Sequence, residues 1–142
     1  MYRLPGHLGL PVKHFPGRSL CETQSIPQSY LVQGTRTIYL GGDSGLTQEF
    51  RRIGTNNSID LGFLPIGYYR PASFRSGHMS PEDTLEAMEM LRAKRMAPIH
   101  WGAFRLSLEP VEDPARRLLH LLAERRINPK AILLQLGEKI LI

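Results

Sequence analysis

Residues 59–66 of the chain read Ile-Asp-Leu-Gly-Phe-Leu-Pro-Ile and are followed by Gly67. The run has the length of a β-strand, and its near-continuous hydrophobicity is typical of a strand that is covered on both faces. Such a strand belongs to a sheet with other layers packed against it. We therefore predict an α/β architecture, in which helices lie outside a sheet.

On the N-terminal side, short β-prone runs precede this strand. Residues 30–33 and 37–40 are joined by Gly-Thr-Arg, which predicts a hairpin with a three-residue connection. Apolar residues then recur at helical spacing from Leu46 onward and predict a helix with Gly54 at its C-cap. Alternation in residues 8–12 indicates a further short strand near the start of the chain.

On the C-terminal side, two helices are expected around another strand. Ser80 and Pro81 form a helix start, because serine caps the first turn and proline fits the first helical position. Residues 96–99 predict a short strand, and Pro98 within it indicates an edge or irregular position. Asp113 begins the last helix, which ends before an Asn-Pro pair.

The end of the chain reads as one more hairpin. Residues 132–136 and 139–142 are β-prone runs on either side of a Gly-Glu pair. The predicted order of elements is therefore β-β-α-β-α-β-α-β-β, with no internal repeat and no linker. At 142 residues, the chain has the length of one domain.

Composition narrows the class of protein. With 42% hydrophobic residues but no apolar run long enough to span a bilayer and no leader-like start, we expect a cytoplasmic protein. A single cysteine, Cys21, excludes an internal disulfide and a cysteine-rich zinc site. The net charge of +5 is spread over arginine doublets, which are usually solvated helix faces, so no nucleic-acid partner is expected.

Three polar residues share one position in the predicted fold. His14, Asp43 and His100 each follow an apolar strand, at the point where it gives way to a loop or glycine turn. Strand ends are where α/β sheets assemble sites, and imidazole and carboxylate are ligands that zinc accepts. Taken singly, each residue also fits a structural role, as a hydrogen-bonded histidine or a turn-forming aspartate.

Five motifs, in order along the chain, resemble the metallo-β-lactamase-fold hydrolases, and most closely the branch that contains the N-acylphosphatidylethanolamine-hydrolysing phospholipase D. They are the segments 14–20 (HFPGRSL), 39–45 (YLGGDSG), 66–71 (IGYYRP), 78–83 (HMSPED) and 97–104 (APIHWGAF). The resemblance covers nearly the whole chain. It implies a four-layer αββα sandwich and a zinc-dependent hydrolase.

The resemblance also implies roles for the metal ligands. By this likeness His14 is a ligand of one zinc, Asp43 is the carboxylate that bridges two zincs, and His100 is a ligand of the other. Two zincs would lower the pKa of a bridging water, and the resulting metal-bound hydroxide would attack a phosphodiester. The expected substrate is a phosphodiester or a lipid-like small molecule.

Further residues would act around the metals. His78 matches a family histidine near the reaction centre, where it would hydrogen-bond a phosphoryl oxygen or the leaving group; a residue that merely precedes a helix cap is the alternative. Tyr69 and Trp101 would shape the substrate pocket, unless they only pack against neighbours. Arg18 would orient an anionic group of the substrate, or form a surface ion pair.

The main signature of the family, HxHxDH, is absent from the sequence. Residues 1–142 therefore resemble the C-terminal half of the domain, and we expect the chain alone to be inactive or nearly so, because it offers too few ligands. Its sheet would leave an apolar face for a missing half-domain, a second copy of the chain or a membrane surface. A non-catalytic half-domain and a lactonase of the same fold are the alternatives.

Overall fold

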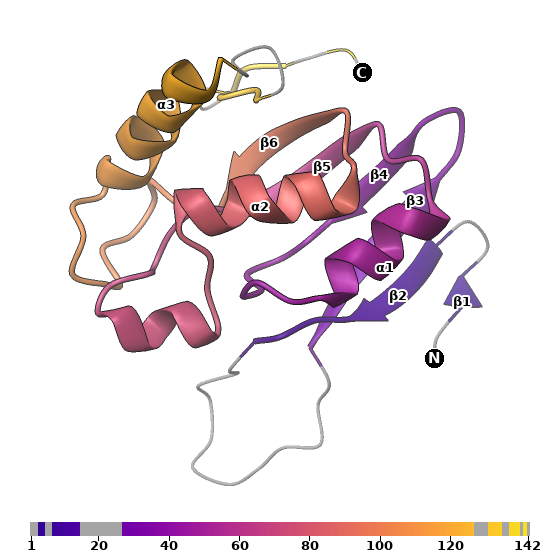
Figure 1. Cartoon of the computed structure of the whole chain (residues 1–142), viewed down its shortest axis with the longest axis horizontal. Helices are drawn as coiled ribbons and strands as arrows, with labels where there is room; N and C mark the ends of the chain where they lie inside the picture. Colours follow the sequence, from indigo (N-terminus) through magenta and orange to yellow (C-terminus); the bar gives the residue numbers. More distant parts are fainter. Residues whose placement is uncertain are drawn as a thin grey trace, which may run out of the picture.

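The computed structural model describes residues 3–4, 7–14, 27–126, 131–134, 137–139 and 141. A mixed six-stranded sheet lies beneath a layer of helices (Figure 1). The strands are β1 (Arg3–Leu4), β2 (His7–Pro11), β3 (Gln28–Gln33), β4 (Thr37–Leu40), β5 (Leu61–Pro65) and β6 (Arg95–Ile99). The helices are α1 (Glu49–Asn56), α2 (Pro81–Leu91), α3 (Asp113–Arg125) and a 3-10 helix, η1 (Ala72–Ser76). The predicted α/β class is confirmed.

The strands lie in the sheet in the same order as in the sequence. Strands β1 to β4 form an antiparallel meander, which confirms the hairpin of β3 and β4, whereas β4, β5 and β6 are parallel. Parallel neighbours need a crossover, and α1 and α2 supply the two crossovers. Because β2 also runs in the direction of β4, the C-terminal ends of β2, β4, β5 and β6 meet at one edge of the sheet.

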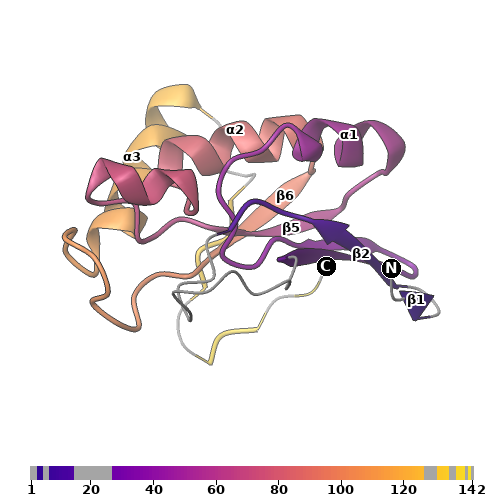
Figure 2. The ribbon, with the colours of Figure 1, turned by 90° about the horizontal axis from the view of Figure 1, so that it is seen from below.

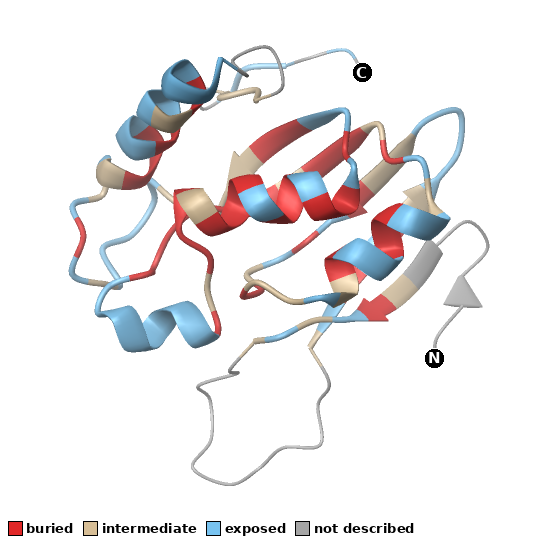
Figure 3. Cartoon of the chain, viewed as in Figure 1, coloured by how far each residue is buried: buried red, intermediate tan, exposed pale blue. Residues whose placement is uncertain are grey.

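The core lies between the sheet and the helices. Helices α1, α2 and α3 all cover the same face of the sheet, as Figure 2 shows, and each of them carries buried residues, which are red in Figure 3. The cluster joins Leu31, Tyr39 and Met96 of the sheet to apolar side chains of the helices, among them Phe50, Ile53, Leu85, Met88, Leu91, Leu118 and Leu122. The apolar spacing that predicted these helices is therefore the spacing of the residues that they bury.

Gly54 is not the C-cap that the sequence predicts. Helix α1 continues through it to Asn56, and Gly54 is buried. A Cβ at this position would lie only 2.5 Å from the backbone carbonyl carbon of Leu91 and would also collide with the carbonyl oxygen of Met90. The glycine is needed because the backbones of α1 and α2 touch at this point, and not because the helix ends there.

Helix α2 begins as predicted. The Ser80 hydroxyl accepts a hydrogen bond from the Asp83 backbone N–H, and the Asp83 carboxylate accepts one from the Ser80 backbone N–H, so the two residues form a capping box. Pro81 occupies the first turn. The strand with Pro98 also lies where the proline indicates, because β6 is the last strand of the sheet.

The predicted C-terminal hairpin is wrong for the residues that the structure describes there. None of residues 131–134, 137–139 and 141 belongs to a strand. Ala131 forms a single parallel bridge with Met96, and the Ile132 N–H donates to the Met96 carbonyl at 2.8 Å. The backbone groups at the edge of β6 thus bond to the described part of this segment. The sequence pattern instead predicts that the segment pairs with itself as a hairpin. The remaining residues of the predicted hairpin lie outside the described part.

The sheet face away from the helices carries exposed apolar side chains. Tyr30 of β3 and Leu40 of β4 are cross-strand neighbours, and 46% of Tyr30 and 37% of Leu40 are exposed. No helix in the described ranges has the length and apolar character needed to cross a membrane.

Candidate metal centre

The candidate site lies where chain segments meet at the C-terminal edge of the sheet. Lys13, just after β2, forms an antiparallel bridge with Gly45, and the Gly45 N–H donates to the Lys13 carbonyl at 2.6 Å. On its other side, Gly45 packs so closely on the segment after η1 that a Cβ would lie 3.0 Å from the Ser76 carbonyl oxygen and 3.1 Å from the Gly77 carbonyl carbon. Because glycine has no side chain, the segment after β4 can contact both the segment after β2 and the end of η1 at this position.

The two N-terminal candidates, His14 and Asp43, meet directly. The His14 Nε2 lies 3.2 Å from the Asp43 Oδ2, with 16% of the His14 side chain and 47% of the Asp43 side chain exposed. The His14 Nδ1 lies 3.3 Å from the Gly77 carbonyl oxygen, to which it donates when it carries the proton. When a neutral ring donates through Nδ1, its Nε2 carries a lone pair, and this lone pair faces the Asp43 carboxylate. A cation bound by both groups would remove the repulsion between them.

The separation of these two atoms suits a metal ion. Two ligands of a tetrahedral zinc with bonds of about 2.0 Å are about 3.3 Å apart. The 3.2 Å between the His14 Nε2 and the Asp43 Oδ2 is close to that value. The donor types and their spacing therefore fit zinc.

His78 and His100 lie beside this pair. Their rings are stacked, with centroids 5.6 Å apart and planes at 11°, and the ring of His78 meets the ring of His14 edge-on at 5.2 Å. The Nδ1 of His78 and the Nε2 of His100 are buried and have no hydrogen-bond partner within the described residues. Buried polar atoms are normally satisfied, so these two nitrogens are candidate contacts for a ligand.

Burial sets the charge of both rings. It lowers the pKa of His78 and of His100, and in His78 the nearby His14 lowers the pKa further. Both rings are therefore neutral at pH 7, and a neutral imidazole is the form that binds a metal.

Backbone geometry turns His100 toward the site. His100 follows β6 with a φ of 60°, in the left-handed region, and Tyr68 follows β5 with a φ of 64°. The Tyr68 ring packs edge-on against His100, with centroids 4.4 Å apart, and its hydroxyl donates to the Phe104 carbonyl at 3.2 Å. Sequence reasoning missed Tyr68, because neither of two adjacent tyrosines carries a signal for the φ reversal.

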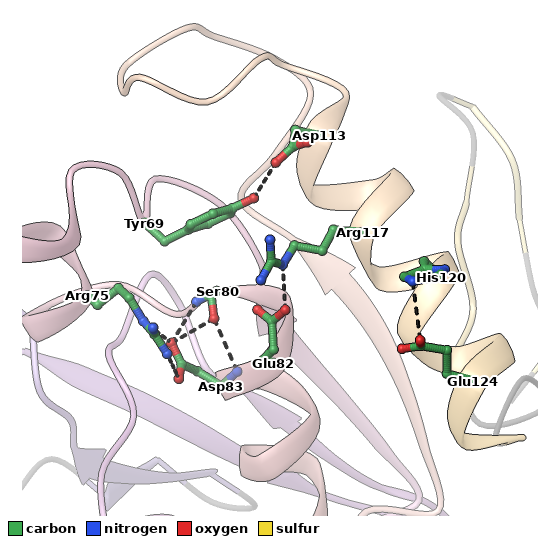
Figure 4. Close-up of polar contacts among 9 residues, drawn as sticks. All are labelled: Tyr69, Arg75, Ser80, Glu82, Asp83, Asp113, Arg117, His120 and Glu124. Atoms are coloured by element: carbon green, nitrogen blue, oxygen red, sulfur yellow. Dashed lines mark hydrogen bonds and ion pairs between the residues drawn. The ribbon is translucent and has the colours of Figure 1, made fainter.

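Tyr69 points elsewhere. Its hydroxyl donates to the Asp113 Oδ2 at 2.6 Å, which ties the loop after β5 to α3 (Figure 4). Burial and this hydrogen bond raise the pKa of Tyr69, so it stays neutral. Glu109, a buried carboxylate that sequence reasoning also missed, holds the same loop by accepting from the backbone N–H groups of Tyr69 and Arg70 at 3.1 Å each.

Trp101, another predicted substrate residue, lines a small pocket together with Tyr68 and His100. The Trp101 Nε1 donates to the Pro98 carbonyl at 3.3 Å, and its half-buried ring packs against the core. Arg18 lies outside the described residues. A role of Tyr69, Trp101 or Arg18 in substrate binding stays a prediction.

The chain supplies only part of a metal site in the described residues. Among those ranges, no three side chains of His, Cys, Asp or Glu come close enough together to hold one ion. Hydrolytic zinc sites usually have three protein ligands. The chemical type and spacing of His14 and Asp43 thus fit zinc. A complete hydrolytic site would need further protein ligands besides these two.

Residues 6–101 match the model of a family described as the beta-lactamase superfamily domain. The chain belongs to the metallo-β-lactamase superfamily. The metallo hydrolase Igni18 from the archaeon Ignicoccus hospitalis shares the fold, with a TM-score of 0.68 and 22% identity over 96% of this chain and 53% of that structure. The predicted resemblance is therefore confirmed for the superfamily.

Two curated relatives show how much of a longer protein the chain matches. A UPF0173 metal-dependent hydrolase of Geobacillus sp. is 46% identical over 69 residues, which are 49% of this chain and 27% of that protein. The N-acyl-phosphatidylethanolamine-hydrolyzing phospholipase D 1 of Caenorhabditis elegans is 32% identical over 122 residues, which are 82% of this chain and 34% of that protein. The chain thus spans about a third of the length of these relatives.

Proposed function

We propose that this chain forms one side of a zinc-dependent hydrolase centre that acts on phosphodiesters. The observation that carries the proposal is the convergence of His14, Asp43, His78 and His100 at one edge of the sheet, with two buried ring nitrogens left without partners. These four side chains come from four separate segments, and their contacts reveal no structural role that they share.

In this proposal, His14 and Asp43 would hold one zinc, and the Nε2 of His100 would be a donor to a second one. Zinc in such a centre polarises an oxygen of the substrate and lowers the pKa of a bound water to about 7. The remaining donors come from a second polypeptide segment, which packs against the apolar sheet face that Tyr30 and Leu40 expose. The chain alone is therefore inactive or nearly so.

His78 has a different role from the ligands. Its ring is neutral because burial lowers its pKa, and its Nδ1 has no partner. A neutral imidazole carries one N–H, which can donate a hydrogen bond to a phosphoryl oxygen or to the departing oxygen. We assign this hydrogen bond to the Nδ1 of His78, which would carry the proton at the edge of the centre.

The likeness to a phospholipase D supports a phosphodiester, and specifically a lipid one, as the substrate. The exposed Phe74 supports an apolar substrate portion: it is 42% exposed and lies beside His78, with ring centroids 6.5 Å apart. An apolar ring at the rim of the centre would contact an acyl chain and leave the polar head group to the histidines.

Zinc binding by the full chain tests the first half of this proposal. We expect binding in isothermal titration to be lost in His14→Ala and Asp43→Asn and weakened in His100→Ala. His120→Ala is the matched control, because His120 is a histidine of α3 whose side chain is 71% exposed and pairs with Glu124, 3.4 Å away (Figure 4). Equal zinc binding in His14→Ala and His120→Ala contradicts the ligand assignment. Two tightly bound ions in the unmodified chain contradict the need for further donors.

Substrate class needs a separate assay. The zinc-loaded chain is compared on bis(p-nitrophenyl) phosphate, on vesicles that contain N-acylphosphatidylethanolamine, and on a lactone. We expect only trace turnover, on the two phosphodiesters, that disappears in His78→Ala. Turnover of the lactone alone would contradict the phosphodiester assignment, and the absence of any turnover together with zinc binding would favour a non-catalytic half-domain.

A further inference from the structure

The short helix η1 holds two parts of the candidate centre although it buries none of its own side chains. At its C-terminal end, the Gly77 and His78 N–H groups both donate to the Phe74 carbonyl at 3.0 Å. The Gly77 carbonyl is the partner of the His14 Nδ1, and His78 follows directly. A segment without buried side chains needs polar contacts to keep such a position.

One η1 side chain supplies that contact. Arg75 forms a bidentate ion pair with Asp83 of α2: its Nε lies 3.0 Å from Oδ2 and its Nη2 2.5 Å from Oδ1 (Figure 4). Paired hydrogen bonds of this kind fix both distance and orientation. Among the side chains of η1, it is the sole ion pair to another element in the described structure.

The partner of Arg75 is held in place by further hydrogen bonds. Asp83 is 9% exposed, and its carboxylate also accepts from the Ser80 backbone N–H at 3.0 Å and from the Ser80 hydroxyl at 2.9 Å. The next residue, Thr84, is buried and donates its hydroxyl to the Pro65 carbonyl at the end of β5. The first turn of α2 is thereby joined to the sheet edge that carries the centre.

We propose that Arg75 is a positioning residue of the centre. By clamping η1 to Asp83, it holds the Gly77 carbonyl where it accepts the His14 Nδ1–H, so that Nε2 of His14 faces Asp43, and it places His78 against both rings. The expected effect on metal binding rests on the proposed function, in which His14 is a zinc ligand. Groups that orient a ligand in this way typically change metal affinity by about 10-fold to 100-fold when they are removed.

A neighbouring ion pair provides a matched control. Arg117 of α3 pairs with Glu82, the residue before Asp83 on the same turn of α2 (Figure 4). Its side chain is 44% exposed, compared with 49% for Arg75. Arg117→Met removes an arginine–carboxylate pair from the same helix start without touching η1, so it reports what a merely structural ion pair does.

The test uses the full chain with Arg75→Met, Arg75→Lys and Arg117→Met. The readouts are the tautomer of His14, from long-range ¹H–¹⁵N correlation spectra of its ring, and the zinc affinity from titration. With zinc bound, we expect the Nδ1–H tautomer and equal zinc affinities in the unmodified chain and in Arg117→Met. In Arg75→Met we expect a mixture of tautomers and zinc affinity about 10-fold lower. Arg75→Lys, which keeps the charge and loses the fork, should lie between them.

The outcomes separate the two proposals. A His14 tautomer and a zinc affinity that are unchanged in Arg75→Met, or that change as much in Arg117→Met, overturn the positioning role. If the unmodified chain binds no zinc, the proposed function fails, and the tautomer comparison in metal-free protein still decides whether Arg75 orients His14. If Arg75→Met does not fold, the comparison of Arg75→Lys with Arg117→Met decides.

Discussion

Gly67 lies directly against the backbone carbonyl of His100: a Cβ at position 67 would collide with the His100 oxygen and lie 3.4 Å from its carbonyl carbon. The end of β5 and the end of β6 thus touch through their backbones. A displacement of this carbonyl would shift the backbone of His100, whose φ is 60°, and with it the direction of the ring.

Gly67→Ala should therefore both destabilise the protein and weaken the centre. We expect a loss of about 2 kcal/mol in the free energy of unfolding, the usual size of an overpacking effect, with a fall in zinc affinity. Urea unfolding and zinc titration measure the two effects. Gly62→Ala, within β5 itself, is the control, because a Cβ there would meet its nearest neighbour at an ordinary 3.7 Å. Equal effects of the two substitutions would refute the role of the contact.

Gly54→Ala tests the backbone contact of α1 with α2. Alanine raises intrinsic helix propensity by about 1 kcal/mol over glycine, so an isolated helix would gain stability. Here the added Cβ would lie 2.5 Å from the Leu91 carbonyl carbon, so we expect a net loss of 1 to 3 kcal/mol, roughly, in urea unfolding. A more stable variant would show that α1 and α2 separate without cost. Thr55→Ala, an exposed substitution in the same helix, should change stability little.

The stability of the fold should fall in acid through Asp83. Burial alone would raise the pKa of this carboxyl, but the hydrogen bonds from Arg75 and Ser80 outweigh it and hold the pKa below the usual value. With a folded pKa below the unfolded value of about 3.9, Asp83 stabilises the fold above about pH 4, and this contribution is lost as the pH falls through the folded pKa.

Asp83→Asn should flatten that acid dependence in urea unfolding curves recorded from pH 7 down to pH 2. Glu89→Gln is the control, because the Glu89 side chain is 68% exposed and lies 3.9 Å from its partner Arg125. An unchanged slope in Asp83→Asn would mean that other carboxyls govern the acid transition.

Leu40→Lys should lower self-association of the isolated chain. Leu40 and its neighbour Tyr30 are exposed on the sheet face that no described helix covers, and apolar patches of this kind promote association. We expect sedimentation velocity to show less concentration dependence for the variant, at nearly unchanged thermal stability. Leu119→Lys, at a 52% exposed position on α3, is the comparison. Identical sedimentation of the two variants would argue against this face as the associating surface.

The sequence predicts well those features that local chemistry determines. The start of α2 depends on Ser80, Pro81 and Asp83, which lie within four positions of each other, and the β3–β4 hairpin depends on one short turn. The convergence of His14, Asp43 and His100 was expected as well, because strand ends that share a direction share an edge, and the family resemblance implied that His78 lies near them. Their chemical roles stay predictions.

Features that depend on contacts between distant segments were not predictable. Gly54 looks like a helix end until the backbone of α2 is placed against it. The choice between Tyr68 and Tyr69 depends on a single φ reversal, which turns Tyr68 toward His100 and sends Tyr69 toward Asp113. The pattern of the C-terminal segment alone predicts a hairpin, whereas in the structure Ala131 of this segment bridges to Met96 at the edge of β6.

The hydrogen bond between His14 and Gly77 joins residues 63 positions apart in the chain. Contacts of such high contact order form only after long loops have closed, and loop closure is slow and entropically costly. We therefore expect the centre to form late in folding, once these distant segments have come together. A metal that binds there would recognise the native state alone, so its binding energy would add directly to the stability of the whole fold.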